Sequence, residues 1–318
     1  MYSSSKIDAS NFVSGVDTAF MLILGISLLF LVGITTTMIY FIVKYNQKRN
    51  PKAKQIEGST KLEIIWTVIP TILVLIMFYF GWAGWRPMKN PPKDAMEITA
   101  IARMWSFQFK YENGKVMDSL YVPKDQPVKL NLEALDVIHS LYIPAFRVKE
   151  DMVPGRTKNM WFVAKSEGEY DLFCTEYCGL QHSYMITGVK VLPQEEFDTW
   201  YADTTATVLS EAEGALPGAK GLALIRQNGC NACHSSDGSA LVGPSFLGTY
   251  GATHVVITDG EEREITVDDD YIKRSIYEPN ADIVKGYNQG LMLSYKDLIS
   301  EDEIQDIIDY IQSLNGNQ

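Results

Sequence analysis

The four cysteines of this 318-residue sequence fall in two short clusters, and a histidine closely follows each cluster. The first cluster places two thiols, an imidazole and a thioether within twelve residues, in the segment Cys174-Thr175-Glu176-Tyr177-Cys178-Gly179-Leu180-Gln181-His182-Ser183-Tyr184-Met185. Sulfur ligands combined with imidazole select copper, and a methionine suits a zinc site less well. The segment therefore predicts a copper site.

A second histidine for this site is found upstream, where His139 lies in the stretch Asp136-Val137-Ile138-His139-Ser140. Two thiolates can bridge a pair of copper ions, each ion then takes one histidine, and a methionine and a backbone carbonyl serve as weak end ligands. Two other interpretations stay open, a structural zinc site and a disulfide between Cys174 and Cys178, which is compatible with a compartment outside the cytoplasm. The disulfide would leave His139, His182 and Met185 without a role.

The second cluster is Cys230-Asn231-Ala232-Cys233-His234, which has the Cys-x-x-Cys-His pattern that attaches a c-type haem. The thiols bond to the haem vinyl groups and the histidine ligates the iron, although redox dithiols and zinc sites use related patterns. Met292, the only methionine after this motif, is the predicted sixth ligand. His254 is the alternative, but it precedes a predicted hairpin around Asp259-Gly260, so we expect it to be exposed.

Two segments, residues 20–43 and 64–85, contain no charged residue. Each is long enough to cross a hydrocarbon layer of about 30 Å as a helix, and Pro70 in the second is tolerated there. The loop between them is strongly basic, with Lys44, Lys48, Arg49, Lys52, Lys54 and Lys61 against Glu57 and, directly before the second segment, Glu63. By the positive-inside rule this loop is cytoplasmic, so we expect a two-pass protein with both termini and all later residues on the outer side.

The remaining sequence divides into a β-rich part and a helical part. Residues 95–193 consist of short β-type runs separated by turn residues, which predicts an all-β sandwich or barrel; the expected strands include 97–102, 128–134, 160–163, 169–173 and 187–192. Residues 194–216 predict a short helix and a linker. Residues 217–318 predict a helical domain, with amphipathic helices at 220–227 and 301–314 and a capping box of Ser300 and Glu303 before the latter.

The pattern Cys-x-Glu-x-Cys-x-x-x-His-x-x-Met, with an upstream histidine in a Val-Ile-His-Ser context, resembles the CuA motif of cytochrome c oxidase subunit II. The resemblance covers about 190 residues, from the membrane segments (1–94) through the β domain. It implies a two-helix transmembrane hairpin followed by a cupredoxin domain. It also implies a binuclear copper centre bound by His139, Cys174, the carbonyl of Glu176, Cys178, His182 and Met185, and a magnesium ion that the Glu176 side chain reaches at the interface with subunit I.

Two further stretches resemble this family. In Met104-Trp105-Ser106-Phe107-Gln108-Phe109 the first tryptophan matches the residue through which electrons enter above CuA, so Trp105 is the candidate, while we expect Phe107 and Phe109 to be core residues. Residues 62–70 resemble the start of the second helix, where a glutamate stands at the entrance of a proton channel into subunit I. Glu63 is the candidate there, although a carboxylate at a membrane boundary needs no special function.

The C-terminal part resembles class I cytochromes c. The loop Gly286-Tyr287-Asn288-Gln289-Gly290-Leu291-Met292 resembles their methionine loop, except that Leu293 stands where proline is frequent, and Gly243-Pro244 resembles the loop beside the proximal ligand. A copper domain followed by such a domain resembles the caa-type oxidases. The resemblance implies subunit II of an aerobic respiratory oxidase in the bacterial cell membrane, which passes electrons from its haem c to CuA and on to subunit I for the proton-translocating reduction of oxygen to water.

The charge distribution bears on partners. From Gln194 onward there are 22 acidic and 7 basic residues, a balance of −15 in a chain whose net charge is −11. This argues against nucleic acid and favours a basic soluble cytochrome c, or a quinol:cytochrome c reductase complex, as electron donor; a merely solvated acidic face is the alternative. Other oxidase subunits and membrane lipid are the remaining expected partners.

The residues also bear on four other functions. A CuA-containing subunit of a membrane nitric oxide reductase is the alternative that the residues leave open, whereas nitrous oxide reductase needs a large catalytic domain that the sequence does not contain. Quinol oxidase subunits keep the fold but lose the copper ligands, which are all present here. A copper-delivery protein would have neither a haem motif nor a use for Met185.

Overall fold

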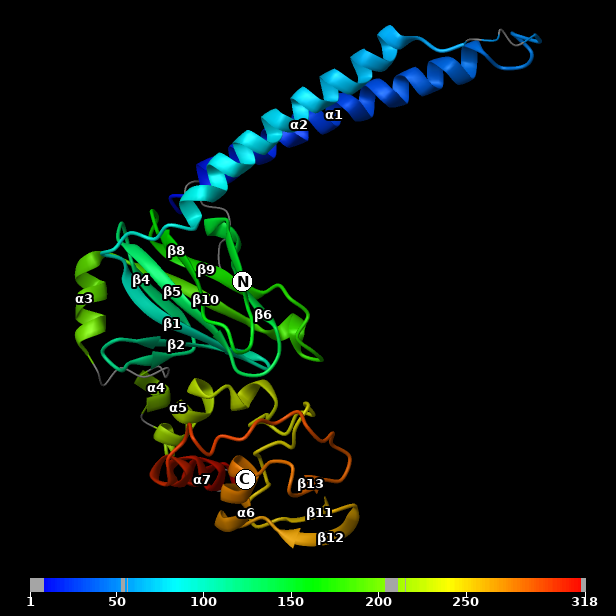
Figure 1. The fold of residues 1–318 in the computed structure, drawn as a ribbon. Helices are drawn as coiled ribbons and strands as arrows, with labels where there is room; N and C mark the ends of the chain where they lie inside the picture. Colours follow the sequence, from blue (N-terminus) through cyan, green and yellow to red (C-terminus); the bar gives the residue numbers. More distant parts are fainter. Residues whose placement is uncertain (1–8, 53–54, 56, 204–210, 215, 316–318) are drawn as a thin grey trace.

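The computed structural model describes residues 9–52, 55, 57–203, 211–214 and 216–315. Two long helices project as a hairpin from one side of a β-sandwich, and a smaller domain covers the opposite side (Figure 1). Lys54 of the predicted basic loop, and residues 204–210 of the predicted linker, lie outside the described residues.

The hairpin consists of α1 (Val13–Lys44) and α2 (Thr60–Met88), both longer than the predicted spans. The helices extend past the apolar stretches because polar residues at their outer ends contact the sandwich. Arg147 forms an ion pair with Asp17 of α1, at 2.8 Å, and the indole of Trp161 donates a hydrogen bond to the carbonyl of Pro87 in α2. The most apolar window of each helix is entirely unburied within the chain, as expected for side chains that face lipid.

The sandwich contains the ten strands β1 (Met96–Arg103), β2 (Ser106–Tyr111), β3 (Val116–Met117), β4 (Leu120–Pro123), β5 (Pro127–Ala134), β6 (His139–Ile143), β7 (Val148–Met152), β8 (Lys158–Val163), β9 (Gly168–Cys174) and β10 (Ile186–Leu192). One sheet has the order β3-β2-β1-β5-β8 and the other β4-β10-β9-β6-β7. In β5, buried and half-buried side chains alternate, which is the period of a strand with one face in a core. The all-β prediction and all five named strands are confirmed.

Helix α3 (Gln194–Ala202) packs on the sandwich. Phe197 is buried, and the Trp200 ring stacks on Tyr121 with 4.5 Å between ring centroids. The short helix expected after residue 194 is therefore present and belongs spatially with the β domain. The domain boundaries themselves stay a prediction.

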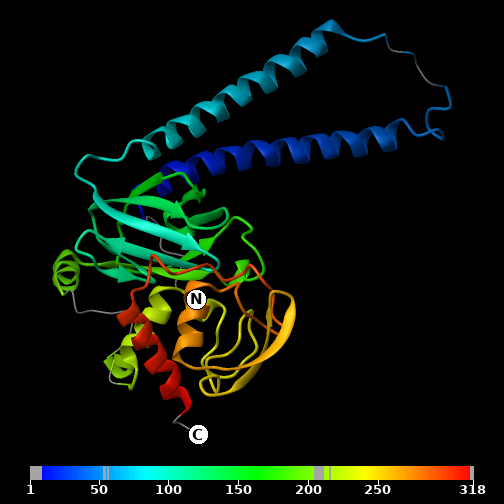
Figure 2. The same ribbon diagram turned by 60° about the horizontal axis from the view of Figure 1, so that its bottom comes forward.

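The C-terminal domain contains α4 (Glu211–Gly214), α5 (Ala219–Gln227), η3 (Cys230–Ala232), β11 (Thr253–Thr258), β12 (Glu261–Thr266), α6 (Asp269–Tyr277), β13 (Ile283–Val284) and α7 (Glu301–Asn315). Gly221 allows α5 to approach α7 closely, because a Cβ there would collide with the carbonyl of Asp306. The capping box is present: Ser300 N donates to Glu303 Oε2 at 2.8 Å. The predicted hairpin also forms, and β13 joins it in a small sheet beside the helices (Figure 2).

Candidate copper and haem centres

The first cluster is assembled by the β6–β9 pair, in which Leu141 lies opposite Cys174. This register places His139, at the start of β6, beside Cys174, at the end of β9. The loop that follows Cys174 then returns toward the same place before β10 begins, bringing Cys178, His182 and Met185 with it. Side chains 35 residues apart in sequence thus meet because two strands pair.

The distances agree with one compact donor set. The sulfurs of Cys174 and Cys178 are 3.7 Å apart, Cys174 Sγ is 3.9 Å from His139 Nδ1, and Cys178 Sγ is 3.5 Å from His182 Nδ1. Met185 Sδ lies 3.8 Å from Cys178 Sγ, and the carbonyl of Glu176 lies 3.3 Å from Cys174 Sγ. All six groups named from the sequence come together, and both thiols are free rather than joined in a disulfide.

Asp136 orients His139. Its Oδ1 lies 2.7 Å from His139 Nε2, and its Oδ2 accepts a hydrogen bond from the backbone N–H of Met104 at 2.6 Å. Because Nε2 is engaged by the carboxylate, Nδ1 is left to face Cys174, an arrangement that metal-binding histidines commonly use. Sequence reasoning missed Asp136, although an acid three residues before a candidate ligand was a usable signal.

The two thiols of this cluster titrate differently. Burial raises the pKa of the Cys174 thiol, but hydrogen bonds from His139 and the backbone outweigh it and lower that pKa to about 6. Burial and then the neighbouring Cys174 thiolate raise the pKa of Cys178 to about 12. Two sulfurs this close cannot both ionise easily without a cation between them, so the pair is suited to a positively charged metal centre.

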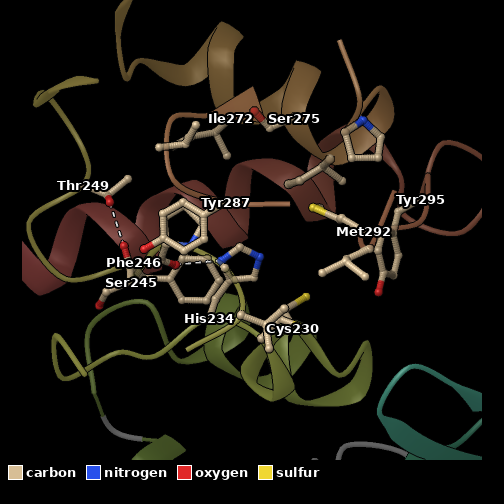
Figure 3. Close-up of a pocket in the computed structure, with 18 of the residues that line it drawn as sticks. Cys230, His234, Ser245, Phe246, Thr249, Ile272, Ser275, Tyr287, Met292 and Tyr295 are labelled. Carbon is tan, nitrogen blue, oxygen red and sulfur yellow. Dashed lines mark hydrogen bonds between the residues drawn. The ribbon is translucent and has the colours of Figure 1, made fainter. Parts of the chain in front are cut away.

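The second cluster forms a pocket in the C-terminal domain. Cys230, Cys233, His234 and Met292 all line it, and Figure 3 shows His234 and Met292 within it. The His234 ring stacks on Phe246 with 5.0 Å between centroids. The four residues named from the sequence are therefore brought to one cavity.

The imidazole of His234 is held in one orientation. Its Nδ1 lies 2.7 Å from the carbonyl oxygen of Pro244, and burial lowers its pKa. The neutral ring then donates from Nδ1 and keeps the lone pair of Nε2 for a metal. Gly243 lies against the same ring, so the Gly243-Pro244 pair does border the proximal side as expected.

Burial raises the pKa of Cys230 and of Cys233 to about 11 each. Reactive redox dithiols have a lowered thiol pKa instead, which disfavours that interpretation of the motif. One expectation was wrong: His254 is half-buried and lines the pocket, with Nδ1 lacking a hydrogen-bond partner among the described residues. His254 lies in β11 opposite Ile265 of β12, and β13 pairs with the same strand farther along, at Val256 and Ile257.

Comparison with known proteins agrees with this geometry. Residues 5–81 match the transmembrane domain of cytochrome c oxidase subunit II, residues 106–192 match its periplasmic domain, and residues 218–315 match cytochrome c. Cytochrome c oxidase subunit 2 of Alkalihalophilus pseudofirmus is 30% identical over 307 residues, which are 92% of this chain and 86% of that protein. The chain belongs to the cytochrome c oxidase subunit II family.

Two further relatives match parts of the chain. Cytochrome c oxidase subunit 2 of Bacillus sp. strain PS3 is 36% identical over 169 residues, 48% of each protein. The crystal structure of the periplasmic domain of subunit II of cytochrome oxidase from Bradyrhizobium japonicum is 29% identical, covers 36% of this chain and 97% of that one, and has a TM-score of 0.35.

Membership in the subunit II family implies CuA copper, and the cytochrome c domain implies haem c. The residues fit both groups. A set of two thiols, two imidazoles and a thioether is a copper donor set, and the pocket places an oriented, neutral His234 near the two thiols of the attachment motif. Glu176 is exposed beside the copper cluster, whereas Glu63 lies in the first turn of α2, at the end of the hairpin remote from the sandwich (Figure 1).

The two centres of this subunit II are neighbours across the domain interface. Trp105 is buried, and its indole Nε1 donates to the carbonyl of Cys178 at 3.0 Å. Met104 lines the haem pocket, and Cys233 packs against the hydrophobic core of the sandwich. Consecutive residues thus reach both centres. Phe107 and Phe109 are buried core residues, as expected.

Proposed function

We propose that this chain serves an aerobic respiratory cytochrome c oxidase of the bacterial cell membrane by accepting electrons at its cytochrome c domain and passing them through its CuA domain to subunit I. Oxygen is reduced to water in subunit I, so this chain performs no bond chemistry on oxygen. The observation that carries the proposal is the Met104–Trp105 connection, which reaches the haem pocket on one side and the carbonyl of Cys178 on the other.

Each centre has a proposed set of binding residues. When bound, the copper pair and the haem supply one-electron oxidation and reduction. The copper pair would be held by His139, Cys174, the Glu176 carbonyl, Cys178, His182 and Met185. The haem would be attached to Cys230 and Cys233, with His234 and Met292 as the ligands of its iron. Asp136 fixes the orientation of His139, and Pro244 fixes that of His234.

Trp105 is the proposed residue through which electrons reach the copper site. Its side chain is only 3% exposed, because the cytochrome c domain covers this face of the sandwich. A soluble donor cannot contact Trp105 in this arrangement, so electrons from outside arrive at the cytochrome c domain first. Fusion of the two domains also keeps the internal donor at a high effective concentration.

The external donor is proposed to be basic, either a soluble cytochrome c or a docking surface of a quinol:cytochrome c reductase complex, because the chain from Gln194 onward carries −15. Electrostatic docking weakens as salt screens the charges. Electron uptake measured from a basic cytochrome c should therefore slow as ionic strength rises. Uptake that does not change with salt would contradict electrostatic docking and leave the internal route untouched.

The proposed interface with subunit I includes the loop of the copper cluster. Tyr177, Leu180 and Tyr184 are 77%, 69% and 78% exposed there, an apolar surface that calls for a partner. The exposed Glu176 side chain beside them is the proposed magnesium ligand at that interface. Glu63 is the proposed residue at the entrance of a proton channel. It lies in the first turn of α2, where a negative charge also interacts favourably with the helix dipole.

The proposed orientation follows from the basic loop. Lys48, Arg49 and Lys52 lie at the end of the hairpin remote from the sandwich, and basic loops stay in the cytoplasm. Both termini, the copper domain and the haem domain are then on the outer side. Protease added to intact spheroplasts should digest the sandwich and spare the loop between α1 and α2.

The test of the relay is the metal content and spectrum of the full chain in detergent. We expect about two copper ions and about one iron per chain, a c-type haem band and the near-infrared absorption of a mixed-valence copper pair. Haem without copper, or zinc in place of copper, would contradict the relay. Measuring whether the assembled complex consumes oxygen or nitric oxide distinguishes the oxidase from the alternative, a nitric oxide reductase.

A further inference from the structure

Arg103, the last residue of β1, is buried where the cytochrome c domain meets the sandwich. Only 3% of the surface of this residue is exposed. Nη2 donates to Gln108 Oε1 at 3.2 Å, while Nε and Nη1 have no hydrogen-bond partner among the described residues. Gln108 in turn donates to the carbonyl of Gln227 in α5, at 2.8 Å. Arg103 therefore belongs to the network that joins the two domains.

The positive charge of Arg103 has no acidic counterpart in the described part of the chain. The guanidinium group is a cation, and none of the ion pairs between described residues includes it. Asp136, which binds the amide of the adjacent Met104, is engaged by His139. A buried charge without a counter-ion is costly, so its presence calls for an explanation beyond folding.

The charge faces the wall of the haem pocket. The guanidinium carbon lies 5.3 Å from the centre of the Tyr295 ring, and both Tyr295 and Met104 line that pocket. Cys230 of the haem-attachment motif lines the same pocket. Arg103 is thus placed to act on a group bound by Cys230.

We propose that Arg103 is a positioning residue whose buried positive charge raises the reduction potential of the haem held by Cys230 and Cys233. The inference rests on the haem attachment proposed above. Reduction adds a negative charge to the haem, and a fixed positive charge nearby stabilises the reduced form. Burial keeps water and salt from screening that effect, and charge and burial around a haem are established determinants of its potential.

The test is a redox titration of the full, haem-loaded chain in detergent, followed by haem absorption. It compares the parent chain with three variants. R103M removes the charge and keeps an unbranched side chain, R103K keeps the charge, and K110Q removes an exposed charge from the neighbouring strand β2. We expect R103M to have a lower midpoint potential than the parent chain, R103K to retain most of the parent value, and K110Q to match the parent. The R103M shift should persist at high salt.

Two results would overturn the proposal. If R103M titrates with the parent potential, the charge has no effect on the haem. If R103K shifts as far as R103M, the effect comes from packing and not from charge. If R103M does not retain haem, R103Q, which keeps a donor for Gln108, answers the same question. The redox titration requires neither bound copper nor electron transfer between the centres. If the proposed relay fails, copper is missing or transfer is slow, but the difference in midpoint potential between R103M and the parent chain remains.

Discussion

The indole Nε1 of Trp105 donates a hydrogen bond to the backbone carbonyl of Cys178, with 3.0 Å between nitrogen and oxygen. The next residue, Gly179, lies flat against the same ring, and a Cβ there would be 3.1 Å from Trp105 Cζ2. The chain also contains a matched bond elsewhere: Trp161 Nε1 donates to the carbonyl of Pro87, likewise at 3.0 Å. The two tryptophans make the same interaction, but only one reaches the copper cluster.

Trp105→Phe should slow electron transfer from the haem to the copper centre, because it removes the hydrogen bond that connects the aromatic ring to the Cys178 backbone. Trp161→Phe removes an equivalent bond remote from both centres and should leave the transfer rate unchanged. Each variant loses one buried hydrogen bond, worth about 1 kcal/mol of unfolding free energy. Rapid mixing with a reductant, following haem and copper absorption, measures the rate. Equal rates in the two variants would contradict the route through Trp105.

Asp136→Asn should weaken copper binding by about 10- to 100-fold, the usual effect of removing a group that orients a metal-binding histidine. Asparagine keeps the size of the side chain but loses the carboxylate that holds His139 Nε2. Asp125→Asn is the control, since Asp125 is exposed and its partner is the surface residue Lys165. Competition with a copper chelator measures the affinity. Equal copper affinities in the two variants would contradict an orienting role for Asp136.

The chemistry of both centres could be predicted from local sequence because their ligands are short-range patterns. Cys174 to Met185 and Cys230 to His234 are contiguous segments whose residue types limit the metal or cofactor. His139 could be predicted because it is the only histidine of the β-rich region besides His182. The five named strands and the two amphipathic helices also followed from periodicity and differ from the structure only at their ends, whereas α6 and β13 were not predicted.

The interface could not be predicted in the same way. Arg103, Gln108 and Gln227 look like ordinary polar residues of a strand and a helix, and their meeting depends on how two domains pack. The predicted exposure of His254 was wrong for a related reason, because the turn residues of a hairpin do not indicate which other segments of the domain pack beside it. Contacts between distant segments decide these features, and periodicity contains no information about them.

Stability of the cytochrome c domain should fall in acid because of Asp282. Burial raises the pKa of this carboxyl, but the hydrogen bond from Thr258 and the guanidinium groups of Arg263 and Arg274 outweigh it, so the folded pKa is lowered. A lowered pKa contributes stability above the unfolded value of about 3.9, and that contribution is lost as the pH falls through the folded pKa. Thermal unfolding followed from about pH 5 down to about pH 2 should show the loss.

Asp282→Asn tests the same ion pairs at neutral pH. Because both arginines are 44% exposed, the loss should be about 1–3 kcal/mol rather than the larger cost of a fully buried pair. The variant should also lose the part of the acid dependence that Asp282 supplies. Glu262→Gln, which removes an exposed partner of Lys285, is the control and should change stability little. An unchanged acid profile in Asp282→Asn would show that other carboxylates cause it.

Gly243→Ala should disturb haem binding by displacing His234. A Cβ at residue 243 would lie 2.5 Å from Cε1 and 2.8 Å from Nδ1 of the imidazole, so the ring must move and its bond to the Pro244 carbonyl is lost. Overpacking of this kind costs about 1–3 kcal/mol, and the displaced ring no longer presents Nε2 to the pocket. The expected result is a lower haem content or an altered visible spectrum, together with a lower melting temperature. Gly214→Ala, where no atom of the described residues lies within 4 Å of the new Cβ, should match the parent chain in both measurements. If Gly243→Ala matched it too, the loop before Pro244 would have no part in holding His234.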